Sequence, residues 1–171
     1  MDTLLLMAEA LRYPHPGQVN ALYTKVSKLN GQLGNKIFAD FLAKVESLSL
    51  SEQEELFTRT LDLSPLAAPY VGYQIWGESY KRGEFMAALN SELKTHEIDL
   101  EGELPDHLRP ILQYLSISSS PLPELIEVLE KAIKAMHSSL KKTEKDNPYL
   151  LLFDAIGTES KSLQVDASGT A

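Results

Sequence analysis

The sequence predicts an all-α protein, built as a single-domain helical bundle of about eight helices. Apolar residues recur at helical spacing along most of the 171 residues, proline and glycine separate the apolar stripes, and no stretch shows the sustained alternation of a β-strand. With 43% apolar and 23% charged residues, the composition is that of a globular protein. The length suits one domain. We expect a helical domain over residues 4–156 and a flexible C-terminal tail over residues 157–171.

Four helices are predicted in the first part of the chain. The first ends at residues 13–17, where two prolines and a glycine break the pattern. Apolar stripes predict a second helix over about residues 19–29 and a third over about residues 33–48. Ser51, with Glu54 three residues later, fits a capping box and predicts the start of a fourth helix.

The middle and the end of the chain predict the remaining helices. Residues 62–69 contain two prolines and suit a helix interior poorly, and a short aromatic segment then ends at Gly77. Further helices are expected to begin at about Glu78, at Leu104 with Pro105 in its first turn, at Pro121 capped by Ser120, and at Asn147-Pro148.

Composition and motifs argue against several classes of function. The chain has no cysteine, and its net charge of −8 disfavours binding to nucleic acid. The four histidines are not at the spacings of a local metal clamp, and phosphate-binding and nucleophile motifs are absent. We therefore expect no enzymatic activity, no cofactor and no metal. The apolar start has no basic region and no apolar run is long enough to span a bilayer, so we read no signal peptide and expect a cytoplasmic protein without membrane insertion.

The acidic charge is concentrated in the middle third of the chain. Residues 51–110 contain twelve acidic and five basic residues, together with the single tryptophan. Aromatic rings beside carboxylates suit a basic, amphipathic peptide ligand. The alternative is that the acids form a solvated surface and that the aromatic residues belong to the core.

Four short sequence motifs resemble those of a known protein family. Gly77-Glu78-Ser79-Tyr80-Lys81-Arg82-Gly83 has the form G-E-S-x-x-R-G, and Glu103-Leu104-Pro105-Asp106-His107-Leu108 follows it. Phe57 with Leu61-Asp62, and Leu11-Arg12-Tyr13-Pro14, lie upstream. Together they resemble the nitrate reductase delta-subunit (NarJ-type) assembly chaperones, within the wider TorD/DmsD family of molybdoenzyme maturation chaperones. The resemblance runs from about residue 4 to residue 154.

The resemblance implies a cytoplasmic, non-catalytic, helical chaperone. Such a protein would bind the N-terminal segment of the apo catalytic subunit of a molybdoenzyme, often a twin-arginine signal or its remnant, and hold it until molybdenum cofactor is inserted and the partner subunit is joined. Leu61, Gln74 and Trp76 depart from the residues common in nitrate reductase relatives. The client is therefore left open between nitrate reductase and another member of that molybdoenzyme family.

From these patterns we predict a peptide-binding groove with apolar walls and an acidic rim. Aromatic and aliphatic side chains would line it, and Glu78 and Asp106 would sit at its rim. The candidate peptide-binding residues are Phe57, Leu61, Asp62, Tyr70, Tyr73, Trp76, Glu78, Pro105, Asp106 and His107. In the alternative interpretation, residues 103–108 are only a helix start and Arg82 pairs with Glu78.

Three further expectations belong to this hypothesis. Trp76 is predicted to contribute more to peptide binding than Glu101. Because an ordinary histidine titrates near neutral pH, His107 is predicted to make peptide binding sensitive to pH. The competing functions are a permanent structural or adaptor subunit of a membrane-associated redox complex and, as a third possibility, a small enzyme or nucleotide-hydrolysing factor.

Overall fold

The computed structural model describes residues 3–168, with side chains described as far as residue 163, and it confirms the all-α prediction. Within that range the helices are α1 (Thr3–Ala10), α2 (Gln18–Val26), α3 (Leu33–Glu46), α4 (Leu50–Phe57), α5 (Val71–Trp76), α6 (Tyr80–Thr95), α7 (Leu108–Ile117), α8 (Pro123–Thr143) and α9 (Tyr149–Ser168). A π-helical turn, η1 (Thr58–Asp62), continues α4. The described range thus holds one α-helix more than the approximate number expected.

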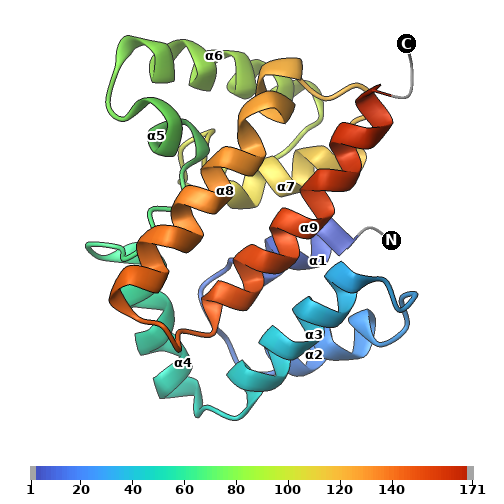
Figure 1. Ribbon diagram of the computed structural model, residues 1–171, viewed down its shortest axis with the longest axis vertical. Coiled ribbons are helices and arrows are strands. Elements are labelled where there is room, and N and C mark those ends of the chain that lie inside the picture. Colours follow the sequence, from blue (N-terminus) through green and yellow to red (C-terminus); the bar gives the residue numbers. More distant parts are fainter. Residues whose placement is uncertain (1–2, 169–171) are drawn as a thin grey trace.

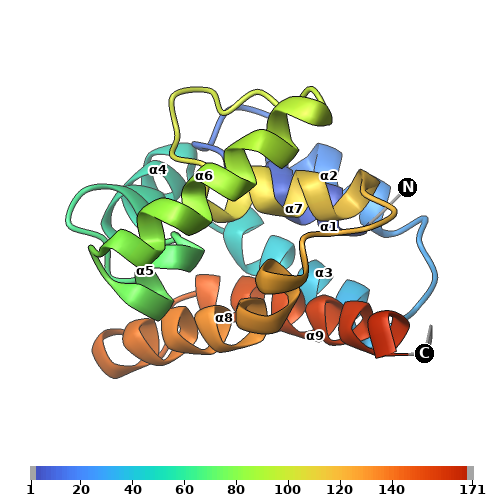
Figure 2. The same cartoon turned by 90° about the horizontal axis from the view of Figure 1, so that it is seen from above.

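The helices pack in layers. Figure 2 shows α8 and α9 along one side of the molecule, α6 along the opposite side, and α1 and α7 between them. Helix α9 packs against both α3 and α8, and α1 packs against α7 (Figure 1). Because α1 also contacts α9, helices from the two ends of the chain share one core.

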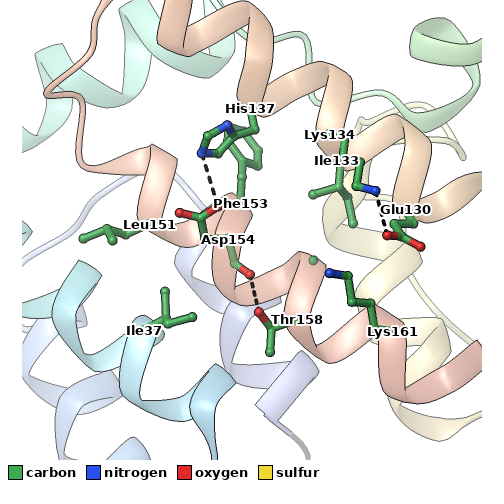
Figure 3. Close-up of a pocket in the computed structure, with 11 residues that line it drawn as sticks. Ile37, Glu130, Ile133, Lys134, His137, Leu151, Phe153, Asp154, Thr158 and Lys161 are labelled. Atoms are coloured by element: carbon green, nitrogen blue, oxygen red, sulfur yellow. Dashed lines mark hydrogen bonds and ion pairs between the residues drawn. The ribbon is translucent and has the colours of Figure 1, made fainter. Parts of the chain in front are cut away.

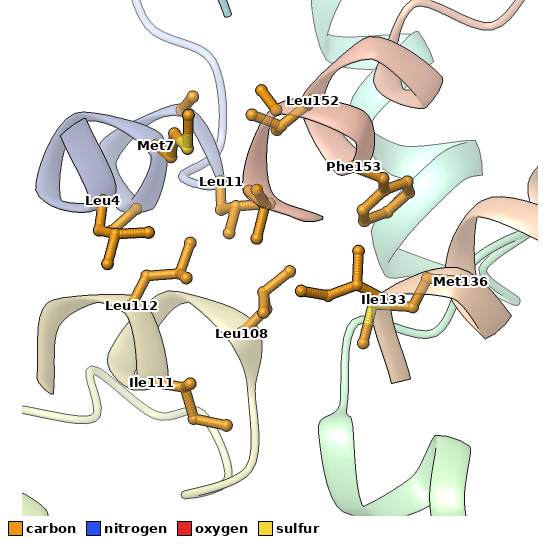
Figure 4. Packing of buried hydrophobic residues seen from close by; sticks show 14 of the residues in the cluster. Leu4, Met7, Leu11, Leu108, Ile111, Leu112, Ile133, Met136, Leu152 and Phe153 are labelled. Carbon is orange, nitrogen blue, oxygen red and sulfur yellow. The ribbon is translucent and has the colours of Figure 1, made fainter. Parts of the chain in front are cut away.

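The core is formed where α1, α7, α8 and α9 meet. Figure 4 shows buried residues at this contact: Leu4, Met7, Leu11, Leu108, Ile111, Leu112, Ile133, Met136, Leu152 and Phe153. Burying one such side chain stabilises a fold by about 1.5–3 kcal/mol relative to leaving it exposed. The regular helices are therefore held by apolar packing, and the connections between α4 and α5 and between α6 and α7 take their shape from polar contacts.

Helix α4 begins at a different cap from the one predicted. The Ser49 hydroxyl accepts the Glu52 N–H at 3.2 Å, and the Glu52 carboxylate accepts the Ser49 N–H at 3.1 Å, which completes a capping box. The sequence pattern fits both Ser49 with Glu52 and Ser51 with Glu54, so the prediction of a capping box was correct but its register was wrong by two residues. Gln53 stabilises this register, because its amide donates to the carbonyls of Val45 and Leu48, both at 3.1 Å.

Two later helix starts also differ from the prediction. Helix α7 begins at Leu108 with His107 as its N-cap, so Pro105 and Asp106 precede the helix rather than form its first turn. Helix α8 begins at Pro123 after Leu122, and Ser120 does not cap it. In each case the proline is near the start, as expected, but proline alone does not specify which residue caps the helix.

The predicted boundary between domain and tail at residue 157 is wrong. Helix α9 continues through this position to Ser168, and Ile156 and Ser160 are both buried. Residues 157–160 therefore belong to the packed part of the helix, whereas Lys161 and Ser162 are exposed. Residues 169–171, the end of the predicted tail, lie outside the described residues.

Candidate functional site

Three of the four resemblance motifs contribute to one pocket of about 260 Å³, which we call the motif pocket. It lies beside the segment that follows α1, the end of α4 with η1, and the connection that leads into α7. Its lining residues are Leu11, Arg12, Tyr13, Phe57, Leu61, Asp62, Tyr70, Glu101, Glu103, His107 and Arg109. Residues far apart in the sequence are thus brought together at one place.

The π-helical turn η1 forms one wall of the motif pocket. The Leu63 N–H donates to the Thr58 carbonyl at 3.0 Å, which closes the wider turn. The buried Thr60 hydroxyl accepts a hydrogen bond from the Asn147 amide at 3.0 Å, which ties η1 to the start of α9. π-Helical turns occur frequently at functional sites. Here the turn buries Leu61 and leaves Asp62 exposed beside it.

The Phe57 side chain forms an aromatic pair at the pocket with Tyr13. The rings meet edge to face with centroids 5.5 Å apart, and the Tyr13 hydroxyl donates to the Glu54 carboxylate at 3.0 Å. Tyr13 is 51% exposed, whereas Phe57 is half-buried. The pair therefore presents aromatic surface to solvent at a pocket that also contains Asp62, which makes no hydrogen bond or ion pair with any described residue.

A short backbone bridge joins Tyr70 to His107, and both residues line the pocket. The Val71 N–H donates to the Asp106 carbonyl and the Leu108 N–H to the Pro69 carbonyl, both at 2.8 Å. The two rings pack edge to face at 5.2 Å. The Tyr70 hydroxyl donates to Glu103 at 2.9 Å, and burial, followed by this hydrogen bond, raises the pKa of Tyr70 to about 12.

His107 is a neutral, buried hydrogen-bonding residue of the motif pocket. Its Nδ1 accepts the Arg109 N–H at 3.0 Å, so the ring proton is on Nε2. Burial lowers the pKa of His107 to about 4. The pKa of His107 thus lies well below the ordinary value on which the expected pH sensitivity of peptide binding was based. Its Nε2–H remains as a donor without a partner among the described residues.

Charges of both signs line the motif pocket. Glu101 pairs with Arg12 and lies 3.1 Å from Arg109, whose guanidinium also donates to the Leu100 carbonyl at 2.6 Å. The hydrogen bond to Glu101 is the largest cause of the raised pKa of Arg12. The predicted groove was apolar with an acidic rim, and in this respect the prediction does not describe the motif pocket.

Asp106 lies in the protein interior and not at a rim. Its carboxylate is fully buried and accepts two hydrogen bonds from the Arg82 guanidinium, at 2.9 and 3.2 Å. The same guanidinium lies over the rings of Tyr70 and Tyr73. Arg82 therefore pairs with Asp106 and not with Glu78, and the ion pair joins the G-E-S-x-x-R-G motif to the E-L-P-D-H-L motif. The ion pair thus fixes the position of the backbone at Asp106, directly before His107.

Gly72 makes room for this ion pair. A Cβ atom at this position would lie 2.8 Å from the Asp106 Oδ2 atom and 3.1 Å from the Arg82 Cγ atom. These distances are shorter than ordinary van der Waals contacts. A glycine on α5 is thus required for the close approach of the buried carboxylate.

The remaining predicted residues lie away from the motif pocket. Trp76 is half-buried against Phe85, with ring centroids 5.0 Å apart, and Lys81 lies over its ring. Tyr73 is 42% exposed, so the aromatic segment is not wholly core, and of its aromatic residues Tyr70 lines the pocket whereas Tyr73 and Trp76 do not. Phe57, Leu61, Asp62, Tyr70 and His107 are brought together in the pocket, whereas Tyr73, Trp76, Glu78, Pro105 and Asp106 do not line it.

Sequence reasoning missed several pocket residues. Arg12 and Tyr13 belong to the L-R-Y-P motif, which was recognised as a resemblance but not as part of a site. Glu103 likewise belongs to the E-L-P-D-H-L motif, but it was not among the candidate site residues. Nothing in the sequence pattern singles out Arg109, because its role depends on burial against Leu100 and Glu101.

A scan against protein-family models and a search of the curated proteins both found no match. No helix in the described range combines the length and apolar character needed to cross a membrane. Among the described residues, no group of three or more His, Cys, Asp or Glu side chains is placed to hold a metal ion. The side chains that line the motif pocket offer hydrogen bonding, ion pairing and aromatic contact.

Proposed function

We propose that this protein is a cytoplasmic maturation chaperone that binds the N-terminal segment of the apo catalytic subunit of a molybdoenzyme. The client would be nitrate reductase or another member of that molybdoenzyme family. The protein would hold the subunit for molybdenum cofactor insertion and assembly, without catalysing a reaction itself. The proposal includes the motif pocket as the place where the client segment binds.

One observation carries this proposal. Residues near position 12, near position 60 and near position 105 line a single pocket, and the buried Arg82–Asp106 pair connects the remaining motif to it. Motifs that served only to stabilise separate helices would have no need to meet. Their meeting at a partly open, polar site supports a shared role in binding.

The pocket offers three kinds of contact to an extended or helical peptide. The exposed edge of the Tyr13–Phe57 pair suits an apolar side chain or the stem of an arginine. The free carboxylate of Asp62 suits a guanidinium or ammonium group. The Nε2–H of His107 suits a carbonyl oxygen, and because His107 is neutral it does not repel a basic peptide.

These contacts would contribute unequally to the free energy of peptide binding. An unstructured client segment loses conformational entropy on binding, so a few buried anchors must supply most of the affinity. An exposed ion pair contributes about 0–1 kcal/mol, whereas truncation of a buried aromatic anchor costs about 2 kcal/mol or more. We therefore assign Phe57 as the principal anchor and Asp62 as a determinant of association rate and selectivity.

The proposal is tested by copurification with a respiratory nitrate reductase catalytic subunit. The subunit is produced with and without its N-terminal segment, in cells that do or do not make molybdenum cofactor. We expect the tagged protein to retain the full-length apo subunit and to lose the truncated one. Asp62→Asn should weaken retention, and because Asp62 is exposed the fold should be unaffected.

Two outcomes would contradict the proposal. Equal retention of the full-length and truncated apo subunits would exclude recognition of the N-terminal segment. A complex that persists with the mature, cofactor-loaded enzyme would indicate a permanent structural subunit instead.

A further inference from the structure

A depression of about 450 Å³ lies beside the motif pocket, at α4 and η1, and we call it the α4 depression. Tyr13 lines both cavities, which places them side by side. The other residues that line the depression include Glu54, Glu55, Thr58, Arg59 and Leu63. The concave surface at the motif pocket therefore continues past Tyr13.

The spacing of side chains along α4 and η1 divides them between the two cavities. Glu54 and Thr58, four residues apart, line the α4 depression. Phe57 and Leu61, also four residues apart, line the motif pocket. The Tyr13 ring packs on Phe57 with centroids 5.5 Å apart, and its hydroxyl donates to Glu54 at 3.0 Å. Because Tyr13 is 51% exposed, it forms the surface that a ligand spanning both cavities would cross.

Leu63 presents an apolar side chain at the α4 depression. It is 71% exposed, yet its backbone is held, because its N–H donates to the Thr58 carbonyl at 3.0 Å. The turn that follows is held as well, since the Leu66 N–H donates to the Arg59 carbonyl at 3.2 Å. An exposed leucine on a fixed backbone offers apolar area that a ligand can bury without first ordering the protein.

The carboxylates around the α4 depression exceed the cations that contact them. Glu54 makes no ion pair with any described residue, and its hydrogen-bond partner, the Tyr13 hydroxyl, is uncharged. Arg59 is shared between Glu55 at 2.8 Å and Glu144 at 3.0 Å, so one guanidinium serves two carboxylates. These three acids and one arginine carry a net charge of −2, which favours a cationic occupant.

The motif pocket supplies an independent indication of a ligand. His107 is 7% exposed, and its Nε2–H has no partner among the described residues. No fully buried side-chain nitrogen or oxygen in the described range lacks a hydrogen-bond partner, so this N–H is not sealed in the interior and opens into the pocket that His107 lines. A neutral N–H donor at this place suits a peptide carbonyl.

We propose that one cationic, amphipathic peptide segment occupies the motif pocket and the α4 depression together, and crosses the Tyr13 ring between them. An apolar side chain of the segment packs on Leu63, and a lysine or arginine near it pairs with Glu54. Because the occupant is the client segment, this second subsite rests on the proposed function. It requires a client segment that is longer than the motif pocket alone can hold, with a basic and an apolar residue in the added part.

The test is calorimetric titration of the full chain with a synthetic peptide of the N-terminal segment of a respiratory nitrate reductase catalytic subunit. Leu63→Ser should weaken binding about fivefold, and Glu54→Gln, whose amide oxygen still accepts the Tyr13 hydroxyl, about threefold. In about 1 M sodium chloride the effect of Glu54→Gln should vanish, because the Debye length falls to about 3 Å, whereas the effect of Leu63→Ser should remain.

Two matched variants control for general effects of changing exposed surface. Leu33→Ser changes a leucine that is 64% exposed at the start of α3, and Glu127→Gln removes an exposed carboxylate from α8. Neither residue lines either cavity, so both variants should bind the peptide as the wild type does. Thermal unfolding checks that all four variants are folded.

A double-mutant cycle identifies the peptide cation that Glu54 contacts. Each basic residue of the peptide is replaced by methionine in turn, and each product is titrated into the wild type and into Glu54→Gln. One replacement should weaken binding to the wild-type chain about threefold and leave binding to Glu54→Gln unchanged. Additive effects for every replacement would show that no peptide cation pairs with Glu54, and this would overturn the proposed subsite.

Two other outcomes separate this subsite from the function on which it rests. Unchanged affinity in Leu63→Ser and Glu54→Gln, or losses equal to those of the two control variants, would overturn the subsite, and the proposed function would stand if Phe57→Ala still weakens binding. A peptide that fails to bind the wild-type chain would overturn both.

Discussion

The motif pocket differs from another cavity of about 380 Å³ between α3, α8 and α9, the α8–α9 hollow (Figure 3). The motif pocket lies where η1 and two irregular connections meet, and buried or half-buried polar groups such as His107, Arg109 and Tyr70 shape it. The hollow lies between long, regular helices whose aliphatic side chains leave a space. One cavity depends on buried polar contacts, and the other combines aliphatic side chains at its centre with exposed or half-buried charged groups such as Glu130 and Asp154.

This difference bears on stability and on function. Buried polar groups need partners, so changes around the motif pocket should be costly and dependent on pH. A gap in apolar packing needs no specific partner, so the hollow should tolerate filling. The following experiments test whether changes to the polar contacts and helix caps are costly, in order of decreasing expected effect.

The largest effect is expected for the buried ion pair. Arg82→Met leaves the fully buried Asp106 carboxylate without its partner, and the free energy of unfolding should fall by about 3–5 kcal/mol. Lys81→Met is the matched control, because it removes the neighbouring exposed pair with Glu124 and should lower the free energy of unfolding far less than Arg82→Met does. Urea unfolding of both variants measures the difference. Similar small losses of stability in the two variants would show that the Arg82–Asp106 pair does not stabilise the segment that leads into α7.

The next effect is a dependence of stability on pH that His107 causes. Its pKa is about 4 in the folded protein and about 6.5 in an unfolded chain, so the unfolded state binds more protons between these values. The free energy of unfolding should therefore fall by roughly 3 kcal/mol as the pH falls from about 6.5 to about 4.

A variant isolates this contribution. His107→Asn retains an acceptor for the Arg109 N–H at the helix cap and removes the titrating ring. Its stability should depend less steeply on pH than that of the wild type over the same range. Parallel pH profiles for the two proteins would contradict burial as the cause of the lowered pKa.

A pair of glycine substitutions should change stability in opposite directions. Gly72→Ala introduces a Cβ atom 2.8 Å from the buried Asp106 carboxylate and should lower the free energy of unfolding by about 1–3 kcal/mol. Gly83→Ala, in α6, meets no atom within 4 Å and should raise it by about 0.5–1 kcal/mol. Thermal unfolding of the two variants provides the comparison, and a loss of stability in both would refute the assigned role of Gly72.

The smallest effect distinguishes the two possible registers of the α4 capping box. Ser49→Ala removes the side-chain acceptor for the Glu52 N–H and should cost about 1 kcal/mol. Ser51→Ala changes an exposed residue inside the helix and should have almost no effect. Chemical denaturation separates them. A larger loss of stability for Ser51→Ala than for Ser49→Ala would show that Ser51 caps α4.

Much of the fold could be predicted because helical periodicity is a local property. The apolar faces of α3, α7 and α8 are explicit in the sequence, and prolines mark several helix starts. The exact caps were less predictable, since Ser49 and Ser51 satisfy the same pattern. The length of α9 was missed because small polar residues after Gly157 resemble a tail, although α9, which packs against α3 and α8, continues to Ser168.

The candidate site was predictable only in part. Short motifs indicated Phe57, Asp62 and His107, but the Arg82–Asp106 contact joins residues 24 positions apart and depends on a loop that no local pattern specifies. The α8–α9 hollow was not predicted at all. Periodicity identifies Ile37 and Ile133 as inward-facing, and it does not show whether the space between them is filled.

The central claim is that the motif pocket, and not the surface around Tyr73 and Trp76, binds the client peptide. It is tested most directly by calorimetric titration of the client N-terminal peptide into Phe57→Ala and Trp76→Ala, with the folding of both variants checked by thermal unfolding. We expect Phe57→Ala to weaken binding by about 2 kcal/mol, roughly 30-fold, and Trp76→Ala to weaken it less than about threefold. A greater loss for Trp76→Ala, or unchanged affinity in Phe57→Ala, would contradict the assignment of the motif pocket as the peptide-binding site.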